Sequence, residues 1–207
     1  MKTKLIPIFL LVIVIASSCK KTETKTITDK VTITDTVTAV EMPVQSVFKK
    51  GILFDTVDVY PPGSGSYEIG VKFYSSDSGV ITKLGVRNPI NSKYAVSLWD
   101  VATQDLLATD SIATTDSAQF AYASISPIHI SPNKEYIVSY NNTVGGVDLG
   151  YNISQSKVTG DVQYPFSDGD ITFISEDELN STTTAYPANE YPNSYLATVD
   201  IVFQAIR

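Results

Sequence analysis

Residues 94–100 read YAVSLWD, and the alternation of their side chains indicates the fold class. In an extended strand successive side chains point to opposite faces, so Tyr94, Val96 and Leu98 share one face and Trp99 lies on the other. The alternation predicts a β-strand with two distinct faces. Tryptophan is a residue type that stacks on ligands, but the place of Trp99 inside an alternating strand favours packing in the core.

Short apolar runs of the same kind recur through residues 48–207. Pro, Gly, Asn, Asp and Ser cluster between these runs at residues 61–65, 75–78 and 141–146, which marks turns. No run longer than about ten residues has the 3.6-residue apolar period of a helix. The pattern predicts an all-β fold, an antiparallel β-sandwich that is jelly-roll-like. The expected strands include residues 51–59 and 171–174.

The only cysteine, Cys19, follows an export signal. Lys2 and Lys4 precede an apolar run over residues 5–15, and the small residues of the sequence ASS stand directly before Cys19. The sequence ASSC resembles a lipobox, although alanine occupies its first position, where leucine is more usual. A transmembrane helix needs about 20 apolar residues, more than this run contains. We therefore expect lipidation of Cys19, and with one cysteine the fold cannot contain an intrachain disulfide.

The signal sets the expected domain organisation. Residues 20–40 are rich in threonine and could form a β-prone, self-pairing stalk or an extended solvated linker. Their position between an anchor and a globular region favours the linker. We expect a lipid-anchored protein of the bacterial cell envelope, at the outer membrane. The sequence does not distinguish a periplasmic from a surface-facing orientation. The predicted parts are a lipoprotein signal peptide at 1–18, a lipid anchor and Thr-rich tether at 19–47, and a β-sandwich domain at 48–207.

The charge of the chain excludes one class of partner. The formal net charge is −7, and loss of Lys2 and Lys4 with the signal peptide would change it to −9. Proteins that bind nucleic acid neutralise phosphates with lysine and arginine. An acidic exported chain is poorly suited to that, so we expect no nucleic-acid partner.

Four short motifs resemble a known family when they are taken in order. They are IGVKF at 69–73, SLWD at 97–100, YIVSY at 136–140 and DIVF at 200–203. Together they resemble a bacterial domain family of unknown function, and the resemblance spans residues 67–205. Members are described as β-sandwich domains of exported proteins, often beside carbohydrate-active or adhesive modules. The resemblance implies a carbohydrate-binding-like sandwich and brings no active site. This chain departs from the family in standing alone on a lipid anchor.

No catalytic motif is visible. His129 is the only histidine, and it alternates with Ile128 and Ile130, which favours a strand position over a catalytic base. A Ser-His-Asp triad on a G-x-S-x-G turn is missing from the sequence. Zinc sites need several histidine or cysteine ligands, which the mature chain does not have. We expect a protein that is not an enzyme.

Acidic residues in the C-terminal third of the chain are candidate ligands for a calcium ion. Asp168 and Asp170 stand in SDGD, and calcium is bound by six to eight oxygen ligands. The spacing does not match an EF-hand, and Asp-Gly is common turn chemistry. A structural calcium ion at Asp168 and Asp170 is the only cofactor we expect. The acidic run at 176–178 that follows is typical of a solvated face.

Tyrosines give the best indication of a ligand. They are concentrated in the last third of the chain among Asn, Ser, Asp and Pro. Sugar rings pack their CH-rich faces on aromatic rings, while amides and carboxylates bond the hydroxyls, although about half of these tyrosines are expected only to pack. The predicted ligand-binding residues are Tyr151, Tyr164, Tyr186, Asn189, Tyr191 and Asn193.

These observations predict a membrane-anchored lipoprotein with a non-catalytic binding domain. A glycan is the expected ligand, and the lipidated Cys19 connects the protein to the membrane. The alternative is a structural or adhesive cell-envelope protein that binds a protein partner.

Overall fold

The computed structural model describes residues 37–54 and 58–207. The chain divides into two units, residues 1–34 and 35–207, and the described residues all belong to the second unit. The predicted signal peptide, the lipidation site Cys19 and most of the predicted tether lie outside the described residues. The predictions made for them stay predictions.

The larger of two main sheets contains the stretch that predicted the fold. It has the order β13-β14-β3-β8-β5-β6, with β15 paired to β14, and its ladders are antiparallel. The strand predicted at 94–100 is β5. The bounds are β3 Tyr67–Ser75, β5 Lys93–Asp100, β6 Leu106–Ala113, β8 Glu135–Asn141, β13 Phe166–Asp168, β14 Ile171–Asn180 and β15 Asn189–Tyr191.

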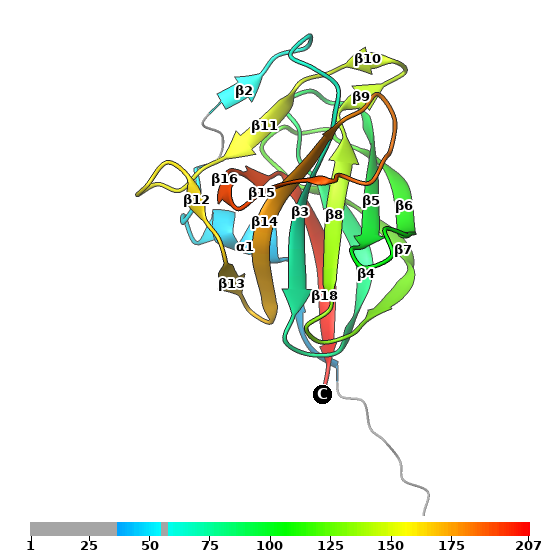
Figure 1. The fold of residues 1–207 in the computed structure, drawn as a ribbon, viewed down its shortest axis with the longest axis vertical. Coiled ribbons are helices and arrows are strands. Elements are labelled where there is room, and N and C mark those ends of the chain that lie inside the picture. Colours follow the sequence, from blue (N-terminus) through cyan, green and yellow to red (C-terminus); the bar gives the residue numbers. More distant parts are fainter. Residues whose placement is uncertain (1–36, 55–57) are drawn as a thin grey trace, which may run out of the picture. The chain divides into compact units, whose positions relative to one another are not determined.

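The smaller main sheet packs behind the larger one (Figure 1). It has the order β1-β18-β4-β7 and is also antiparallel. Its strands are β1 Val37–Glu41, β4 Gly79–Val86, β7 Ala121–Ile130 and β18 Val199–Ile206. The prediction of an all-β, antiparallel β-sandwich is confirmed.

In the described part of the chain, short strands form three smaller sheets. A three-stranded sheet has the order β17-β11-β2, and two further pairs join β9 to β10 and β12 to β16. The bounds are β2 Asp58–Tyr60, β9 Thr143–Val144, β10 Val147–Asp148, β11 Tyr151–Ser154, β12 Val162–Gln163, β16 Asn193–Ser194 and β17 Leu196–Ala197.

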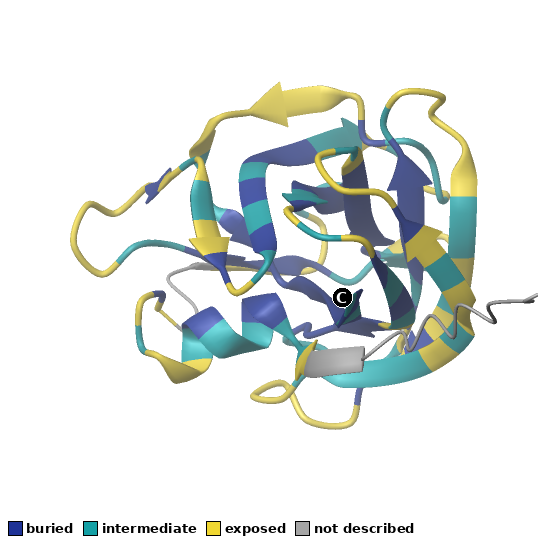
Figure 2. Ribbon diagram, turned by 90° about the horizontal axis from the view of Figure 1, so that it is seen from below, coloured by how far each residue is buried: buried dark blue, intermediate teal, exposed yellow. Residues whose placement is uncertain are grey.

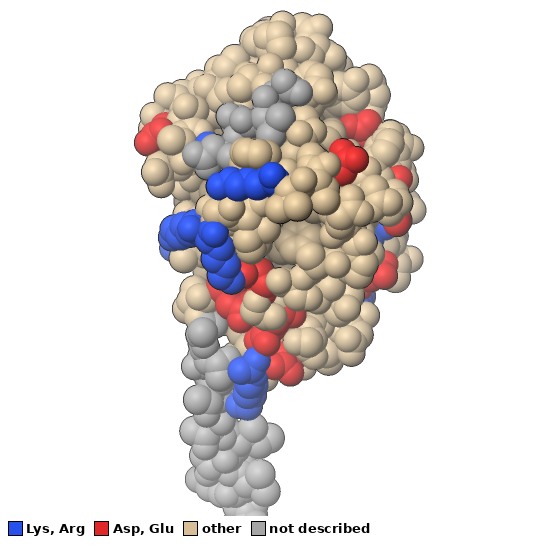
Figure 3. Space-filling view, turned by 90° about the vertical axis from the view of Figure 1, so that its left-hand side faces the viewer, with Lys and Arg blue, Asp and Glu red and all other residues tan. Residues whose placement is uncertain are grey.

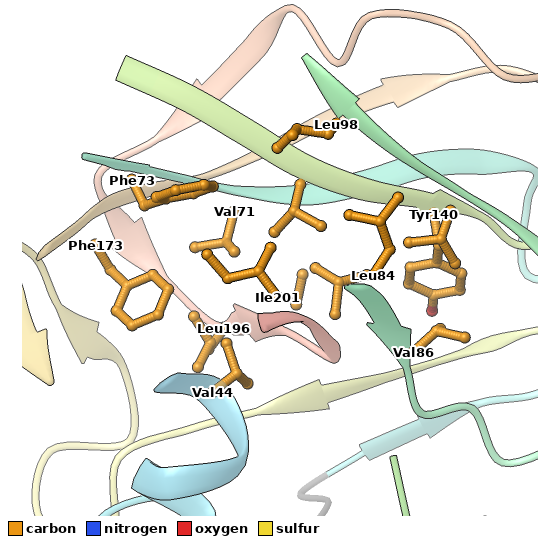
Figure 4. Packing of buried hydrophobic residues seen from close by; sticks show 14 of the residues in the cluster. Val44, Val71, Phe73, Leu84, Val86, Leu98, Tyr140, Phe173, Leu196 and Ile201 are labelled. Carbon is orange, nitrogen blue, oxygen red and sulfur yellow. The ribbon is translucent and has the colours of Figure 1, made fainter. Parts of the chain in front are cut away.

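The hydrophobic core lies between the two main sheets. Figure 4 shows Val71 and Phe73 of β3 pointing toward Ile201 of β18 and Leu84 of β4. Figure 2 shows that buried residues follow the facing strands, while the connecting loops are exposed. Tyr94, Val96 and Leu98 are fully buried in this core, as their shared face predicts.

Trp99 lies on the opposite face of β5 and is 6% exposed. Its indole nitrogen donates a hydrogen bond to Ser139 Oγ at 2.8 Å, and its ring meets Tyr186 edge-on with centroids 5.9 Å apart. The interpretation of Trp99 as a packing residue is confirmed. His129 is an exposed residue of β7 opposite Val80 of β4, so it is a strand histidine as expected.

A short helix, α1 Pro43–Lys49, packs against the core through Val44 and Val47. The first N–H groups of a helix lack partners within it. Here the carboxylate of Asp200, in β18, accepts the N–H groups of Val44 at 3.0 Å and Gln45 at 2.9 Å. Among the described residues, no helix is long and apolar enough to cross a membrane.

The position of α1 corrects the predicted domain boundary. β1 pairs with β18 and α1 is buried against it, so residues 37–47 belong to the sandwich and the predicted tether cannot extend to residue 47. The threonine-rich pattern does not reveal this boundary, because β18, the strand that β1 and α1 contact, lies more than 150 residues later in the chain.

Two predicted strands also need correction. Of the described residues in the strand expected at 51–59, Gly51 adopts a left-handed φ of 69°, Leu53 makes one isolated bridge to Ser156, and a regular strand is found only in β2, which begins at Asp58. The strand expected at 171–174 continues as β14 to Asn180. The second half of β14 contains the acidic run at 176–178. The sequence pattern predicts a solvated face for this run, but it lies within the sheet, and Glu176 and Asp177 are buried.

Candidate functional site

The inward face of β14 changes from apolar to acidic halfway along the strand. Phe173 pairs with Phe73 of β3, but further along Glu176 pairs with Val71 and Glu178 pairs with Ile69. Paired residues on neighbouring strands share a face. Because Val71 and Ile69 are core residues, both glutamates point to the inside of the sandwich.

These glutamates form the floor of a pocket with tyrosine walls. The pocket encloses about 200 Å³ and opens to solvent beside Tyr191, which is 40% exposed. That volume corresponds to roughly seven water molecules, so one small group such as a single sugar ring is the expected size of occupant. We call it the tyrosine–glutamate pocket, and its lining residues are Tyr67, Tyr151, Glu176, Glu178, Tyr191, Ser194 and Tyr195.

The aromatic walls are held by contacts among themselves. Tyr151 of β11 stacks on Tyr60 of β2, with ring centroids 4.5 Å apart and planes 7° from parallel. Tyr67 of β3 meets Tyr151 edge-on at 5.7 Å. Offset and edge-on tyrosine contacts of this kind favour a fixed ring orientation. The wall is therefore built before any ligand arrives.

Glu176 is the most unusual group of the pocket. It is 0% exposed, its carboxyl oxygens accept no well-aligned hydrogen bond within the described part of the chain, and the Tyr195 hydroxyl is the one nearby donor that acts to lower its pKa. Burial, followed by repulsion from Glu178 and Asp177, raises the pKa of Glu176 to about 9. Burying a polar group without a partner costs free energy. A group of this kind inside a pocket is a candidate for ligand contact.

The neighbouring groups keep the pocket rich in hydroxyl donors. The Tyr195 hydroxyl donates to Glu178 Oε2 at 3.2 Å. Burial and the negative charges of Glu176 and Glu178 raise the pKa of the Tyr195 phenol above its usual range, and burial does the same for Tyr151. These phenols therefore stay protonated at neutral pH, while the glutamates supply acceptors.

The structure brings two of the predicted ligand residues together and separates others. Tyr151 and Tyr191 line the pocket. Tyr164 lies next to Tyr195 without lining it: its hydroxyl donates to the Tyr195 carbonyl at 3.0 Å, and its ring packs 5.5 Å from Phe166. Tyr186 packs on Trp99, on the other face of the large sheet.

The two predicted asparagines lie on exposed short strands near the pocket. Asn189 pairs with Glu178 across β15 and β14, and Asn193 of β16 precedes Ser194. Neither lines the pocket. The residues that sequence reasoning did not select are Tyr67, Glu176, Glu178, Ser194 and Tyr195.

The aspartates predicted to hold calcium have cationic partners from the chain itself. Asp168 is ion-paired with Lys50, and both carboxylate oxygens of Asp170 accept from Arg207 Nη2, at 2.6 and 2.7 Å. Figure 3 shows acidic and basic side chains in contact on the lower part of one face. Among the described residues, no group of three acidic, histidine or cysteine side chains could hold a metal ion. Calcium at Asp168 and Asp170 stays a prediction that this arrangement does not support.

Other hollows are less suited to a specific ligand. A cavity of about 320 Å³ between α1 and β13 is lined by Lys50 and Asp168, whose charges are already paired. A second, of about 260 Å³ beside Leu53 and Phe166, is mainly apolar. Only the tyrosine–glutamate pocket combines aromatic walls with a buried carboxyl that lacks a partner in the described structure.

Comparison with known proteins gives a family without an activity. Residues 56–196 match the family described as "Domain of unknown function (DUF4082)". No curated protein matches the chain.

Proposed function

The chain belongs to this family of domains of unknown function, and we propose from the geometry of its pocket that it binds carbohydrate without transforming it. The observation that carries the proposal is the combination of tyrosine rings and carboxyls around one small opening. Aromatic rings offer flat apolar surfaces to the CH groups of a sugar, and carboxyls and phenols bond its hydroxyls. A few polar groups among aromatic ones are typical of small-molecule sites.

The placement of the two glutamates argues against glycoside hydrolysis. Glycosidases use two carboxyls that flank the scissile bond. Glu176 and Glu178 stand two residues apart on one strand and share one face, so both approach a ligand from the same side. The pocket is better suited to holding a sugar than to cleaving one.

Replacement of Tyr191 by alanine should weaken carbohydrate binding about tenfold, because stacking on an aromatic ring contributes on the order of 1 kcal/mol or more. Tyr191 is the lining tyrosine most open to solvent, so its removal leaves the buried wall in place. Binding would be measured by glycan array, followed by calorimetry on the glycans retained.

The matched control is Tyr74→Ala. Tyr74 is a half-buried tyrosine near the far end of β3, and it does not line the pocket. Equal losses in both variants would refute binding at the pocket. No binding to any glycan by the wild-type protein would refute the proposal itself and favour the structural or adhesive alternative, in which a cell-envelope protein is the partner.

We also propose that the sandwich is held at the bacterial outer membrane by a lipid on Cys19. The support is the order of basic residues, apolar run, small residues and cysteine at the start of the chain. Lipid chains on a cysteine anchor through apolar burial of about 0.8 kcal/mol for each CH₂ group. An anchored binding domain would keep a glycan ligand close to the cell envelope.

Replacement of Cys19 by alanine should abolish incorporation of labelled palmitate, because the thiol is the only attachment point of that kind in the sequence. The measurement is metabolic labelling of cells that express the chain, with membrane fractionation in parallel. Ser18→Ala keeps a small residue before the cysteine and should retain the label. An unlabelled wild-type chain would contradict the anchor.

A further inference from the structure

Most buried carboxylates of the sandwich have a partner of suitable charge or several hydrogen-bond donors. Asp177 is 3.4 Å from Lys72 Nζ, and Asp100 is ion-paired with Lys134. Asp200 accepts two backbone N–H groups of α1 and the Tyr122 hydroxyl at 2.7 Å. In each case the chain compensates the charge that it buries.

The tyrosine–glutamate pocket breaks this pattern. Glu176 is buried and accepts no well-aligned hydrogen bond within the described structure, Glu178 interacts only with the phenols of Tyr195 and Tyr191, and no lysine or arginine lines the pocket. Among the described residues that line the pocket, these two carboxyls on one face therefore have no cationic partner. A positive charge that compensates an ionised Glu176 would therefore have to come from a ligand.

The walls of the pocket suit an organic cation. Tyrosines from several elements line the pocket, and the faces of tyrosine rings attract ammonium groups. A protonated amine also offers three donors, which match the carboxyls of Glu176 and Glu178 and a neighbouring phenol oxygen. A calcium ion fits less well, because it takes six to eight oxygen ligands.

We propose that the group bound in this pocket is a protonated amine, and that the carbohydrate recognised is one that carries free amino groups. The inference rests on the proposed carbohydrate binding and names its ligand class. The amine enters between the tyrosine rings and forms charge-assisted hydrogen bonds with Glu176 and Glu178. An N-acetylated sugar of the same shape has no positive charge to offer these carboxyls.

Binding of the amine is coupled to a proton. With its pKa raised by burial, Glu176 is protonated at neutral pH, and an arriving ammonium favours its ionised form. Glu178 faces it from the same strand, and Asp177 acts on it from the opposite face of β14. The groups near it from the other elements are the phenols of Tyr67, Tyr151, Tyr164, Tyr191 and Tyr195. None of these is a cation, so ammonium binding should release a proton from Glu176.

The test compares glucosamine and N-acetylglucosamine oligomers of equal length by calorimetry in two buffers of different ionisation enthalpy. The pH lies below the pKa of the glucosamine amines, so these amines arrive already protonated. The salt concentration is set near 0.15 M, which screens attraction by the net charge of the chain. The wild-type protein should bind the glucosamine oligomer at least about tenfold more tightly and release a proton. Glu176→Gln should lose that preference and the proton release.

Glu135→Gln is the matched control, because Glu135 is an exposed glutamate at the start of β8. It should keep the preference for the amine. Equal loss in both variants would show non-specific attraction to an acidic protein and overturn the inference. Equal binding of both oligomers would overturn the amine while leaving carbohydrate binding intact. Binding of neither oligomer would also overturn the inference that the ligand is a protonated amine. The glycan array would then test carbohydrate binding separately.

Discussion

Replacement of Gly150 by alanine should lower the free energy of unfolding by roughly 2–5 kcal/mol. Gly150 stands directly before Tyr151 and has a φ of 74°, in the left-handed region. A side chain there is strained in any surroundings. In addition, a Cβ atom at this position would overlap the backbone carbonyl oxygen of Tyr60.

The overlap is expected to disturb the tyrosine–glutamate pocket as well as to lower the stability of the fold. Tyr60 of β2 pairs with Tyr151 of β11, and the rings of the same two residues stack. Backbone cannot move aside as a flexible side chain would, so β2 has to separate from β11. We therefore expect the variant to lose the stacked wall of the tyrosine–glutamate pocket and to bind its ligand more weakly.

Gly146→Ala is the control variant, because it introduces the backbone strain of a positive φ without a steric overlap. Gly146 has a φ of 81°, but its added Cβ would meet nothing within 4 Å. This substitution should lower the free energy of unfolding by only about 1–2 kcal/mol, which is the effect of the left-handed conformation alone. Urea unfolding of both variants would measure the difference. Equal losses would mean that close packing of β2 on β11 does not contribute.

Replacement of Glu176 by glutamine should raise the free energy of unfolding at pH 7 by about 3 kcal/mol. In the unfolded chain this carboxyl ionises near its ordinary pKa of 4.5, whereas the folded protein holds its pKa at about 9. Folding at pH 7 therefore has to put a proton on Glu176. Glutamine has nearly the same shape and needs no proton.

The sign of the pH dependence follows from the raised pKa. Below pH 4.5 the carboxyl is protonated in both states and its titration does not affect stability. As the pH rises from 4.5 toward 9, the unfolded state loses this proton first, and the wild-type protein is progressively destabilised. The advantage of Glu176→Gln should therefore be small at pH 4 and grow up to pH 9.

Thermal unfolding of both proteins at pH 4, 7 and 9 would measure this advantage. Burial also raises the pKa of Glu68 to about 7 and that of Asp200 to about 6, so the difference between the proteins isolates Glu176. Glu135→Gln should follow the wild-type protein at each pH. A variant less stable than wild type at pH 7 would mean that Glu176 has a stabilising partner in the folded state.

The tyrosine–glutamate pocket could be only partly predicted from the sequence. Tyr151 and Tyr191 were selected by residue type and neighbourhood, but Tyr164 has the same signature and is used for packing. Glu176 belongs to an acidic run that is typical of a solvated surface, yet it is fully buried. Its face is set by the pairing of β14 with β3, roughly 100 residues earlier in the chain.

Local alternation was enough to predict the sandwich. The pattern of residues 94–100 specifies which side chains share a face, and burial of Tyr94, Val96 and Leu98 follows from their apolar character alone. The same reasoning failed at residues 37–47, where a short strand and a helix gain their stability from β18. A helix of seven residues is too short to be recognised by its own propensity.

The all-β class and the faces of the regular strands follow from the sequence, because both depend on neighbouring residues in the chain. The burial of Glu176 in β14, and the tyrosines that β3, β11 and β15 bring around it, follow from strand pairing that is visible only in the folded protein. Strand order and register join residues far apart in sequence, and the free energy of a buried carboxyl depends on those neighbours. The pocket is therefore a property of the fold, assembled from residues whose local sequence does not distinguish them from surface or core.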